Sequence, residues 1–448
     1  MTRTDRRRWI LLATVSTGLL LITIDNSILY TALPEITRVL GATPGESLWI
    51  INAYPLVMAG LLLGAGTLGD RVGHKRMFVI GLIVFGAASL LAAFSPTALL
   101  LIVARGLLAV GAAAMMPATL ALIRVTFENQ RERNIAIGVW GSVSVVGAAI
   151  GPIVGGLLLE FFWWGSVFLV NVPVVLAAIV ATLILAPGGD RDTSRPWDLL
   201  SSVLAMIGLV GVVVALKEVT KAEPAWALAI GAVVVGGVGL GLFARRQRRL
   251  PYPLLDFAIS RNPALAAGVV AAGLAMFTFA GVELSTTQRF QLVEGFTPLQ
   301  AGFLVAAIAL GSLPGSLLSG AVLHRTGPRP LISGGLLVAA AGILSAVLLL
   351  PLGWGWLVAG LLVAGFGLGF VMSAASSAIM GSAPAHRAGM AASVEEVSYE
   401  LGGLTAVAVL GNLILSIDTG YPAVLGIVAA VLLVAALSTG WLLRPRRS

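Results

Sequence analysis

The stretch GTLGDRVGHK at residues 66–75 returns as GAVLHRTGPR at residues 320–329, with glycine and basic positions at the same spacing. Each stretch lies between two long apolar runs and is short enough to be a tight turn between helices. A repeated turn of this kind predicts that the chain holds two homologous bundles of helices.

The composition places these bundles in a membrane. The 448 residues are 58% hydrophobic and only 11% charged, whereas a soluble domain has about 25% charged residues. Glycine occurs 54 times, which suits close packing of membrane helices. Cysteine is absent and the three histidines lie far apart in predicted loops, so we expect neither a disulfide framework nor a metal or other cofactor.

Apolar runs of spanning length predict fourteen transmembrane helices, because about 20 helical residues cross a bilayer. The runs lie near 9–33, 47–69, 77–94, 98–122, 135–157, 166–186, 198–217, 225–243, 263–286, 298–322, 330–350, 355–380, 388–413 and 421–443. Two six-helix bundles leave the seventh and eighth runs as an extra central pair. We therefore expect an N-terminal bundle at 1–186, the pair with its polar linkers at 187–262, and a C-terminal bundle at 263–448.

The distribution of Lys and Arg sets the predicted orientation. With a cytoplasmic N-terminus, only Arg38, Lys217, Lys221 and Arg289 of the 28 basic residues fall outside, and Arg105 lies within a span. This asymmetry follows the positive-inside rule and places both termini in the cytoplasm. The net charge of +8 is thus a topology signal and gives no reason to expect nucleic-acid binding. The first run shows no cleavage site, so we expect an uncleaved span.

Three acids lie within the apolar run 388–413, namely Glu395, Glu396 and Glu400. A charge at the bilayer centre costs about 2.5–3.5 kcal/mol on insertion scales, so such acids usually line a substrate or proton pathway. Glu396 and Glu400 share a helix face, and Tyr399 is adjacent, which suits a bound cation. Glu395 lies about 100° round the helix, where contact with a polar neighbouring helix is the alternative.

Asp25 and Arg105 lie at similar depths in their predicted spans, so we infer that they pair or compete. A nearby Arg favours an ionised carboxylate, whereas desolvation favours its protonation. Such a group can take up a proton and release it when its surroundings change. A static structural ion pair is the alternative.

Three more residues are candidates for contact with a substrate. Glu283, near the outer end of its run, either reaches the surface beside Arg289 or forms a second acid at a cavity mouth. Trp49 and Tyr54 are aromatic residues that can line an apolar cavity.

Two glycine-containing stretches carry further candidates. In the first repeated turn, Gly66, Asp70, Arg71 and Gly73 predict a gating loop, with simple anchoring at the membrane surface as the alternative. In the fifth run, regularly spaced glycines leave the backbone bare on one side of the predicted helix, and a proline kinks it. Generic helix packing is the alternative interpretation of this motif. Its residues are Gly138, Gly147, Gly151, Pro152, Gly155 and Gly156.

With these motifs the chain resembles the major facilitator superfamily, and most closely its fourteen-helix drug:proton antiporters of the QacA type. The resemblance covers nearly the whole chain and rests on residues 66–75, Arg105 with Gly111, residues 138–156, and DNSILYTALP at residues 25–34. It implies the major facilitator fold, energy from a proton gradient, and export of lipophilic cations. It also supports an acid at Glu396 and Glu400.

The chain departs from the family pattern at several positions. His74 and Ala109 replace residues that are usual in the loop and fourth-helix motifs. Asn52 and Ser312 stand where relatives that accept divalent cations carry acids. The resemblance therefore leaves bulky dications in doubt as substrates.

The sequence thus predicts an all-α polytopic protein of the bacterial plasma membrane that exports small lipophilic cations, such as quaternary ammonium antiseptics and dyes, in exchange for protons. We expect it to work as a monomer in the bilayer by alternating access. No phosphate-binding loop or nucleophile–base pair occurs, so we expect no enzyme activity. The alternatives are an exporter of one endogenous metabolite or antibiotic, and a membrane sensor that does not transport.

Overall fold

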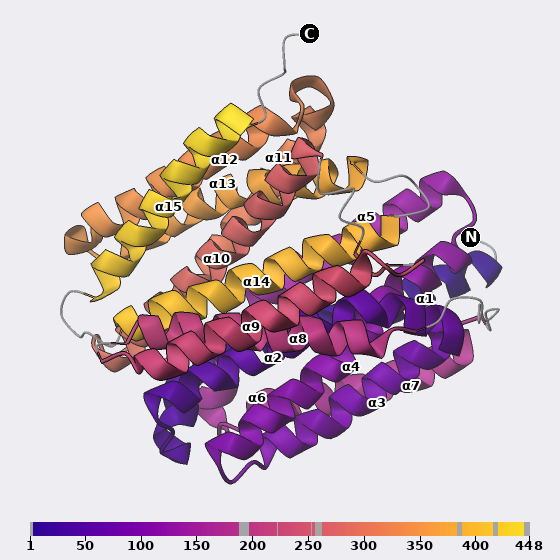
Figure 1. Ribbon diagram of the computed structural model, residues 1–448, viewed down its shortest axis with the longest axis horizontal. Helices are drawn as coiled ribbons and strands as arrows, with labels where there is room; N and C mark the ends of the chain where they lie inside the picture. Colours follow the sequence, from indigo (N-terminus) through magenta and orange to yellow (C-terminus); the bar gives the residue numbers. More distant parts are fainter. Residues whose placement is uncertain are drawn as a thin grey trace. The chain divides into compact units, whose positions relative to one another are not determined.

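The computed structural model describes residues 3–187, 197–221, 223–251, 253–255, 262–382, 388–414 and 420–442, and the regular structure in these ranges is helical (Figure 1). The helices are α1 (Arg3–Leu40), α2 (Pro44–Val72), α3 (His74–Ala93), α4 (Ala98–Thr126), α5 (Gln130–Phe161), α6 (Ser166–Leu169), α7 (Asn171–Leu185), α8 (Leu199–Val219), α9 (Trp226–Gln247), α10 (Pro263–Leu292), α11 (Pro298–Thr326), α12 (Pro328–Leu348), the short η2 (Leu350–Leu352), α13 (Trp354–Gly381), α14 (Ala388–Ile414) and α15 (Gly420–Leu442).

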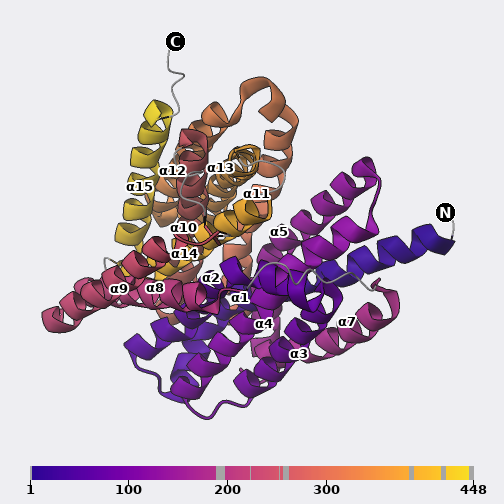
Figure 2. The same ribbon diagram turned by 45° about the vertical axis from the view of Figure 1, so that its right-hand side comes forward.

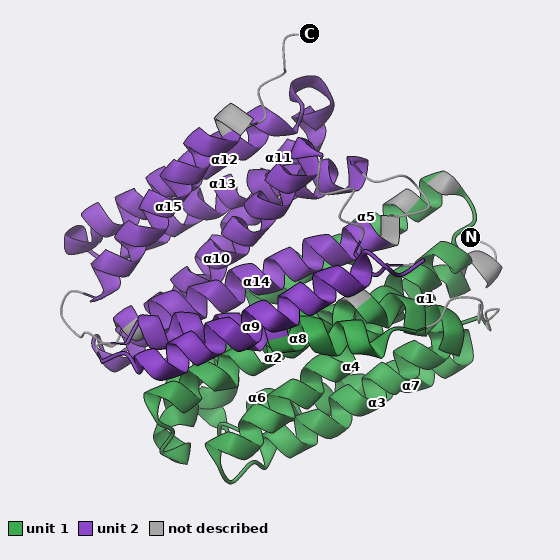
Figure 3. Ribbon diagram, viewed as in Figure 1, with its two compact units in different colours: residues 1–207 green, residues 208–448 purple. Residues whose placement is uncertain are grey.

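The chain divides into two units, Met1–Ile207 and Gly208–Ser448 (Figure 3). The boundary falls inside α8, so this helix contributes its first residues to one unit and the rest to the other. The division at 186/187 and 262/263, which separates an inserted helix pair from two bundles, stays a prediction.

The two units pair their helices in the same order. In the first unit α1 packs on α5, α2 and α3 both pack on α4, and α3 packs on α7 (Figures 1 and 2). In the second unit α10 packs on α14, α11 and α12 both pack on α13, and α12 packs on α15. With α6 and α7 counted as one broken segment, the described helices form two matching sets of six, plus α8 and α9. The all-α fold with two matching sets of six helices is therefore confirmed.

Glycine brings the paired helices into backbone contact. A Cβ atom added at Gly111 of α4 would lie 2.7 Å from the backbone nitrogen of Phe85 and 2.8 Å from the carbonyl oxygen of Gly81, both on α3. In the second unit, a Cβ atom at Gly315 of α11 would lie 2.1 Å from the carbonyl oxygen of Phe366 on α13. Lipid tails are as apolar as the helices, so van der Waals contact of this kind takes over much of the role that hydrophobic burial has in water.

Many of these helices are suited to a membrane. Among the described residues, twelve helices are long and apolar enough to cross one, with α6 and α7 together forming a single span. Helix α2 would be a thirteenth if Pro44–Leu62 and Gly64–Val72, which meet at 62°, form one span. Since α14 lies at the predicted span near 388–413, fourteen spans are compatible with the helices but not established by them.

The repeated turns are shorter than the sequence predicts. Only Gly73 separates α2 from α3, and only Gly327 separates α11 from α12. Their φ angles are 96° and 74°, a region that side chains rarely adopt. The turn predicted at residues 66–75 is therefore wrong in extent, because its other residues continue the two flanking helices, and one glycine is enough to reverse the chain.

Substitution of Gly73 tests the turn. We expect Gly73→Ala to lower the free energy of unfolding by about 1–3 kcal/mol, the usual cost of a strained backbone conformation. Thermal unfolding of the purified protein in detergent, followed by tryptophan fluorescence, measures the change. Gly66→Ala is the matched control, since Gly66 is helical and an added Cβ atom meets nothing within 4 Å. Equal effects of the two changes would contradict this account of the turn.

Candidate functional site

A buried ion pair joins α1 to α4 in the first unit. The Nη1 atom of Arg105 donates to Oδ2 of Asp25, and both side chains are 0% exposed. Arg105 also donates from Nε to the carbonyl oxygen of Ile50 at 3.3 Å and from Nη2 to Oδ1 of Asn26 at 3.1 Å. The pairing inferred from the similar depths of Asp25 and Arg105 is therefore present in the structure.

Tyr54 belongs to the same cluster. The ring centroid of Tyr54 lies 4.7 Å from Cζ of Arg105, and the tyrosine is fully buried. An aromatic face stabilises a guanidinium group without accepting a hydrogen bond. The structure thus places Tyr54 under the ion pair, whereas Trp49, the other predicted cavity aromatic, is half-buried.

Two further residues complete the cluster, and the sequence reasoning missed both. The Nδ2 atom of Asn171 donates to Oδ1 of Asp25 at 3.0 Å and to Oγ of Ser89 at 3.3 Å. Asn171 stands at the start of α7 because Pro173 has no N–H for the carbonyl of Leu169, where α6 ends. The available sequence signal was an amide side chain within the apolar run 166–186.

The structure groups Tyr399 and the three acids of α14 differently from the sequence prediction. Tyr399 donates its hydroxyl to Oε1 of Glu395 at 3.0 Å, and Ser376 on α13 also hydrogen-bonds to the Glu395 side chain. Glu395 is buried, while Glu396 and Glu400 are half-buried. Glu395 thus meets a polar residue of a neighbouring helix, as its alternative interpretation expected. Tyr399, which was predicted to accompany the Glu396–Glu400 face, bonds instead to Glu395.

Glu283 lies in the interior of the second unit. The residue is 6% exposed, so the interpretation in which it reaches the surface is wrong. Arg289, the expected companion at the surface, pairs with Glu294 at 2.8 Å. The interpretation as a second acid in a cavity stays a prediction.

The glycine motif of α5 lets this helix lie directly against α1. Added Cβ atoms would come within 3.1 Å of α1 at three of its members, Gly147, Gly151 and Gly155. The closest approach is at Gly147, where Oγ1 of Thr23 would be 2.0 Å away. Gly138 faces open space, so it takes no part in this contact, and Pro152 lies inside the helix. Gly156 is buried.

The residues of the predicted gating loop lie at the α2–α3 turn. Oδ1 of Asp70 lies 3.3 Å from Nε2 of His74, across Gly73. The second turn has His324 in place of the acid, and this residue accepts from Nε of Arg325 at 3.2 Å. The first turn therefore has an acid–base contact that the second lacks. The gating role of Gly66, Asp70, Arg71 and Gly73 stays a prediction.

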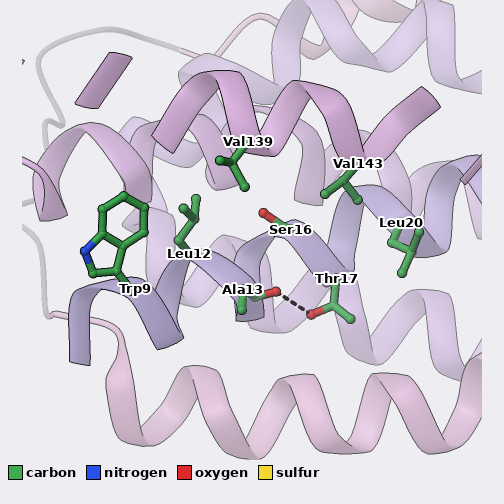
Figure 4. A pocket seen from close by; sticks show the side chains of 8 residues that line it. All are labelled: Trp9, Leu12, Ala13, Ser16, Thr17, Leu20, Val139 and Val143. Atoms are coloured by element: carbon green, nitrogen blue, oxygen red, sulfur yellow. Dashed lines mark hydrogen bonds between the residues drawn. The ribbon is translucent and has the colours of Figure 1, made fainter. Parts of the chain in front are cut away.

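A pocket of about 430 Å³ lies between α1 and α5 in the first unit (Figure 4). Its lining is mostly apolar and consists of Trp9, Leu12, Ala13, Ser16, Thr17, Leu20, Val139 and Val143. Ser16 is 5% exposed, and its hydroxyl has no hydrogen-bond partner within the described residues. Beyond Trp9, the Arg8–Glu132 salt bridge of 3.2 Å links the two helices. The volume and lining suit the apolar part of a small organic molecule.

The two positions that depart from divalent-cation relatives are both buried. Asn52 is 0% exposed, and neither atom of its amide has a hydrogen-bond partner in the part of the chain that the structure describes. Ser312 is 3% exposed and donates to the carbonyl oxygen of Ala309 on its own helix. Neither position therefore supplies a negative charge.

Comparison with known proteins places this chain in a family. The family model described as Major Facilitator Superfamily matches residues 15–402 and residues 264–448. The chain is 39% identical over 412 residues to the methyl viologen resistance protein SmvA of Salmonella typhimurium, covering 91% of this chain and 83% of that protein. It is 38% identical over 413 residues to the multidrug efflux pump LfrA of Mycolicibacterium smegmatis, covering 92% and 82%.

A solved structure shares the fold. The crystal structure of a POT family transporter in complex with 5-aminolevulinic acid matches with a TM-score of 0.69, covering 97% of this chain and 95% of that chain. The sequences are 15% identical, so the likeness concerns the fold alone.

Removal of one partner of the ion pair tests its contribution to stability. We expect Arg105→Leu to destabilise the protein by about 3–5 kcal/mol, because it leaves a buried carboxylate without its cation or forces that group to take up a proton. The double change Arg105→Leu with Asp25→Leu should recover part of the loss. Thermal unfolding in detergent compares the two. A double variant as unstable as the single variant would show that the unpaired carboxylate is not the cause.

Proposed function

The chain belongs to the Major Facilitator Superfamily, and we propose that it is a proton-coupled multidrug efflux antiporter for lipophilic cations. It is a membrane transporter and not an enzyme. The observation that carries the proton-coupled part of the proposal is the fully buried ion pair of Asp25 and Arg105. Burying two charged groups in an apolar unit costs free energy, so a functional role is the best reason for keeping them there.

The similar proteins support organic cations as the substrate class. SmvA is named for resistance to methyl viologen and LfrA as a multidrug efflux pump, and each aligns with more than nine tenths of this chain. Methyl viologen is an organic dication, so export of organic cations of this general kind fits a chain that aligns with 83% of SmvA. Whether dications or monocations are preferred depends on positions such as Asn52 and Ser312, which carry no charge here.

Asp25 is the group that we assign to proton coupling. While it is ionised, it is held by Arg105, and α1 and α4 are tied together by that attraction. Protonation removes the negative charge, so this tie weakens and the contact between the helices has two states. A proton gradient can then bias the alternation between inward-open and outward-open forms of the transporter.

Glu396 and Glu400 are the groups that we assign to the drug cation. Both residues are half-buried on α14, whereas Glu395 is buried and its carboxylate is already bonded to Tyr399. We also assign proton uptake to these two acids, because a carboxylate within the membrane cannot hold a proton and a drug cation together at low cost. Competition between the two cations at Glu396 and Glu400 converts proton entry into drug release, which is the condition for antiport.

We place the protein in the bacterial plasma membrane with both termini in the cytoplasm, working as a monomer. The orientation rests on the positive-inside distribution of Lys and Arg. It makes uptake of protons from the outside and export of drugs from the inside the direction of exchange.

Transport by the whole chain tests the proposal. In a host without its own efflux pumps, expression should raise resistance to ethidium and to monovalent quaternary ammonium compounds, and a protonophore should remove the effect. In proteoliposomes, addition of these cations should drive proton movement, and Asp25→Asn should abolish it, because a neutral amide cannot bind and release the proton.

Resistance to one compound alone would favour a dedicated metabolite exporter. Absence of cation-driven proton movement would favour a membrane sensor. Methyl viologen in the panel tests whether dications are accepted.

The acids of α14 should differ in their effect on substrate affinity. We expect Glu396→Gln and Glu400→Gln each to raise the KM for a cationic dye about tenfold, equivalent to about 1.4 kcal/mol of lost attraction. Glu395→Gln is the matched control and should change KM less, since this residue is already bonded to Tyr399 and Ser376. Initial rates of dye export over a concentration series give the values. A larger effect at Glu395 would reverse the assignment.

A further inference from the structure

The two oxygens of the Asp25 carboxylate have partners of different chemical kinds. Oδ2 accepts from Arg105, and Oδ1 accepts from the amide of Asn171 at 3.0 Å. A guanidinium group has five N–H donors and no acceptor. Arg105 can therefore hold the ionised carboxylate, but it offers nothing to the O–H group that forms when Asp25 binds a proton.

Asn171 has the chemistry that Arg105 lacks. Its side chain carries two N–H donors on one side and a carbonyl acceptor on the other, so a half-turn of the amide exchanges a donor for an acceptor. Behind it, Ser89 accepts from Nδ2 at 3.3 Å, and a serine hydroxyl can equally donate. The amide can thus keep both neighbours after it turns.

Burial increases the free-energy cost of losing a hydrogen bond among Asp25, Asn171 and Ser89. Asp25, Asn171 and Ser89 are between 0% and 1% exposed. A hydrogen bond lost at such a depth is not readily replaced by solvent, so an unsatisfied group would oppose one of the protonation states. The neighbour that serves both states determines how easily Asp25 changes between them.

We propose that Asn171, backed by Ser89, is a positioning residue that holds Asp25 in both its ionised and its protonated form by turning its amide when the proton arrives. With Asp25 ionised, Nδ2 of Asn171 donates to Oδ1 of the carboxylate. With a proton added to that oxygen, the new O–H donates to the amide oxygen of Asn171, and the hydroxyl of Ser89 donates to the same oxygen. This inference rests on the proposed role of Asp25 in proton coupling.

A pH response of this cluster can be assigned to Asp25 because few other titratable groups lie near it. The titratable groups facing it are Arg105 from α4 and, beneath the guanidinium, Tyr54 from α2. Helices α6 and α7 have no charged residues. The charged residues of α2, α3 and α5, and those of α4 apart from Arg105, lie in the terminal turns, and they are Glu46, Asp70, Arg71, His74, Lys75, Arg76, Arg124, Arg131, Glu132, Arg133 and Glu160.

The test replaces Asn171 with Leu, which has a similar size and no hydrogen-bonding group. The lost bond to the charged carboxylate was stronger than the lost bond to the neutral acid, so Asp25 should keep its proton to higher pH. We expect the pH of half-maximal dye export in proteoliposomes to rise by about one unit, a tenfold change in proton affinity. The kcat should fall while the KM for the dye stays the same, because Asn171 is not among the residues that we assign to the drug cation.

An infrared difference spectrum reads the same bond directly. The carbonyl stretch of protonated Asp25, identified by isotope labelling of aspartate and by its loss in Asp25→Asn, should move to higher frequency in Asn171→Leu. Ser89→Ala should give smaller shifts in the same direction, and it keeps the proposal testable if Asn171→Leu does not fold. Thr182→Val is the control, since Thr182 is a buried residue of α7 that donates only to Ala178 of its own helix.

The outcomes separate this inference from the proposed function. If Asn171→Leu and Ser89→Ala keep the pH profile and the infrared band of the wild-type protein while Asp25→Asn abolishes export, the positioning role is overturned and coupling by Asp25 stands. If the wild-type protein shows no proton-driven export, the proposed function falls. The infrared shift would then still report whether Asn171 holds the Asp25 carboxyl group.

Discussion

The need to satisfy one buried carboxylate organises the first unit. Removing an ion from water costs several kcal/mol even after relaxation, and an apolar membrane protein recovers this only through a close counter-ion and further hydrogen bonds. Asp25 obtains them from Arg105 on α4 and Asn171 on α7, while Ile50 and Asn26 accept two further hydrogen bonds from Arg105. The helices that supply these groups are held in register by that requirement, so a change in the charge of Asp25 affects several helices together.

The second unit repeats the helix pairing but not the charges. Helix α13 pairs with α11 and α12 as α4 pairs with α2 and α3, yet α13 has no charged residue where α4 has Arg105. The acids of α14 therefore have no arginine from α13, and Glu395 is served by the neutral groups of Tyr399 and Ser376. The two units thus differ in their charged groups: the first has a sealed ion pair between Asp25 and Arg105, and the second has acids on α14, of which Glu395 bonds to neutral groups.

Close packing makes these sites sensitive to small movements. Glycine brings the backbones of α3 and α4, and of α11 and α13, into contact, and in α5 it lets side chains of α1 such as Thr23 and Ser27 lie against the bare helix. Interfaces of this kind shift between discrete arrangements more readily than they deform gradually. The charge state of Asp25 and the geometry of its helices are therefore linked through rigid neighbours, which is a physical basis for coupling a proton to a change of shape.

The sequence by itself determined the helical membrane fold, because long apolar runs and a repeated turn leave few other structures, and it singled out Asp25 and Arg105 because charges are costly in such runs. It also indicated that glycines 147, 151 and 155 offer a bare helix surface. Only the tertiary structure decided the partners: Asn171 and Ser89 at Asp25, Tyr54 under Arg105, and Tyr399 on Glu395 rather than beside Glu396 and Glu400. Spacing along one helix shows which residues share a face, but the neighbour across that face comes from a distant part of the chain. Its identity depends on how the helices pack.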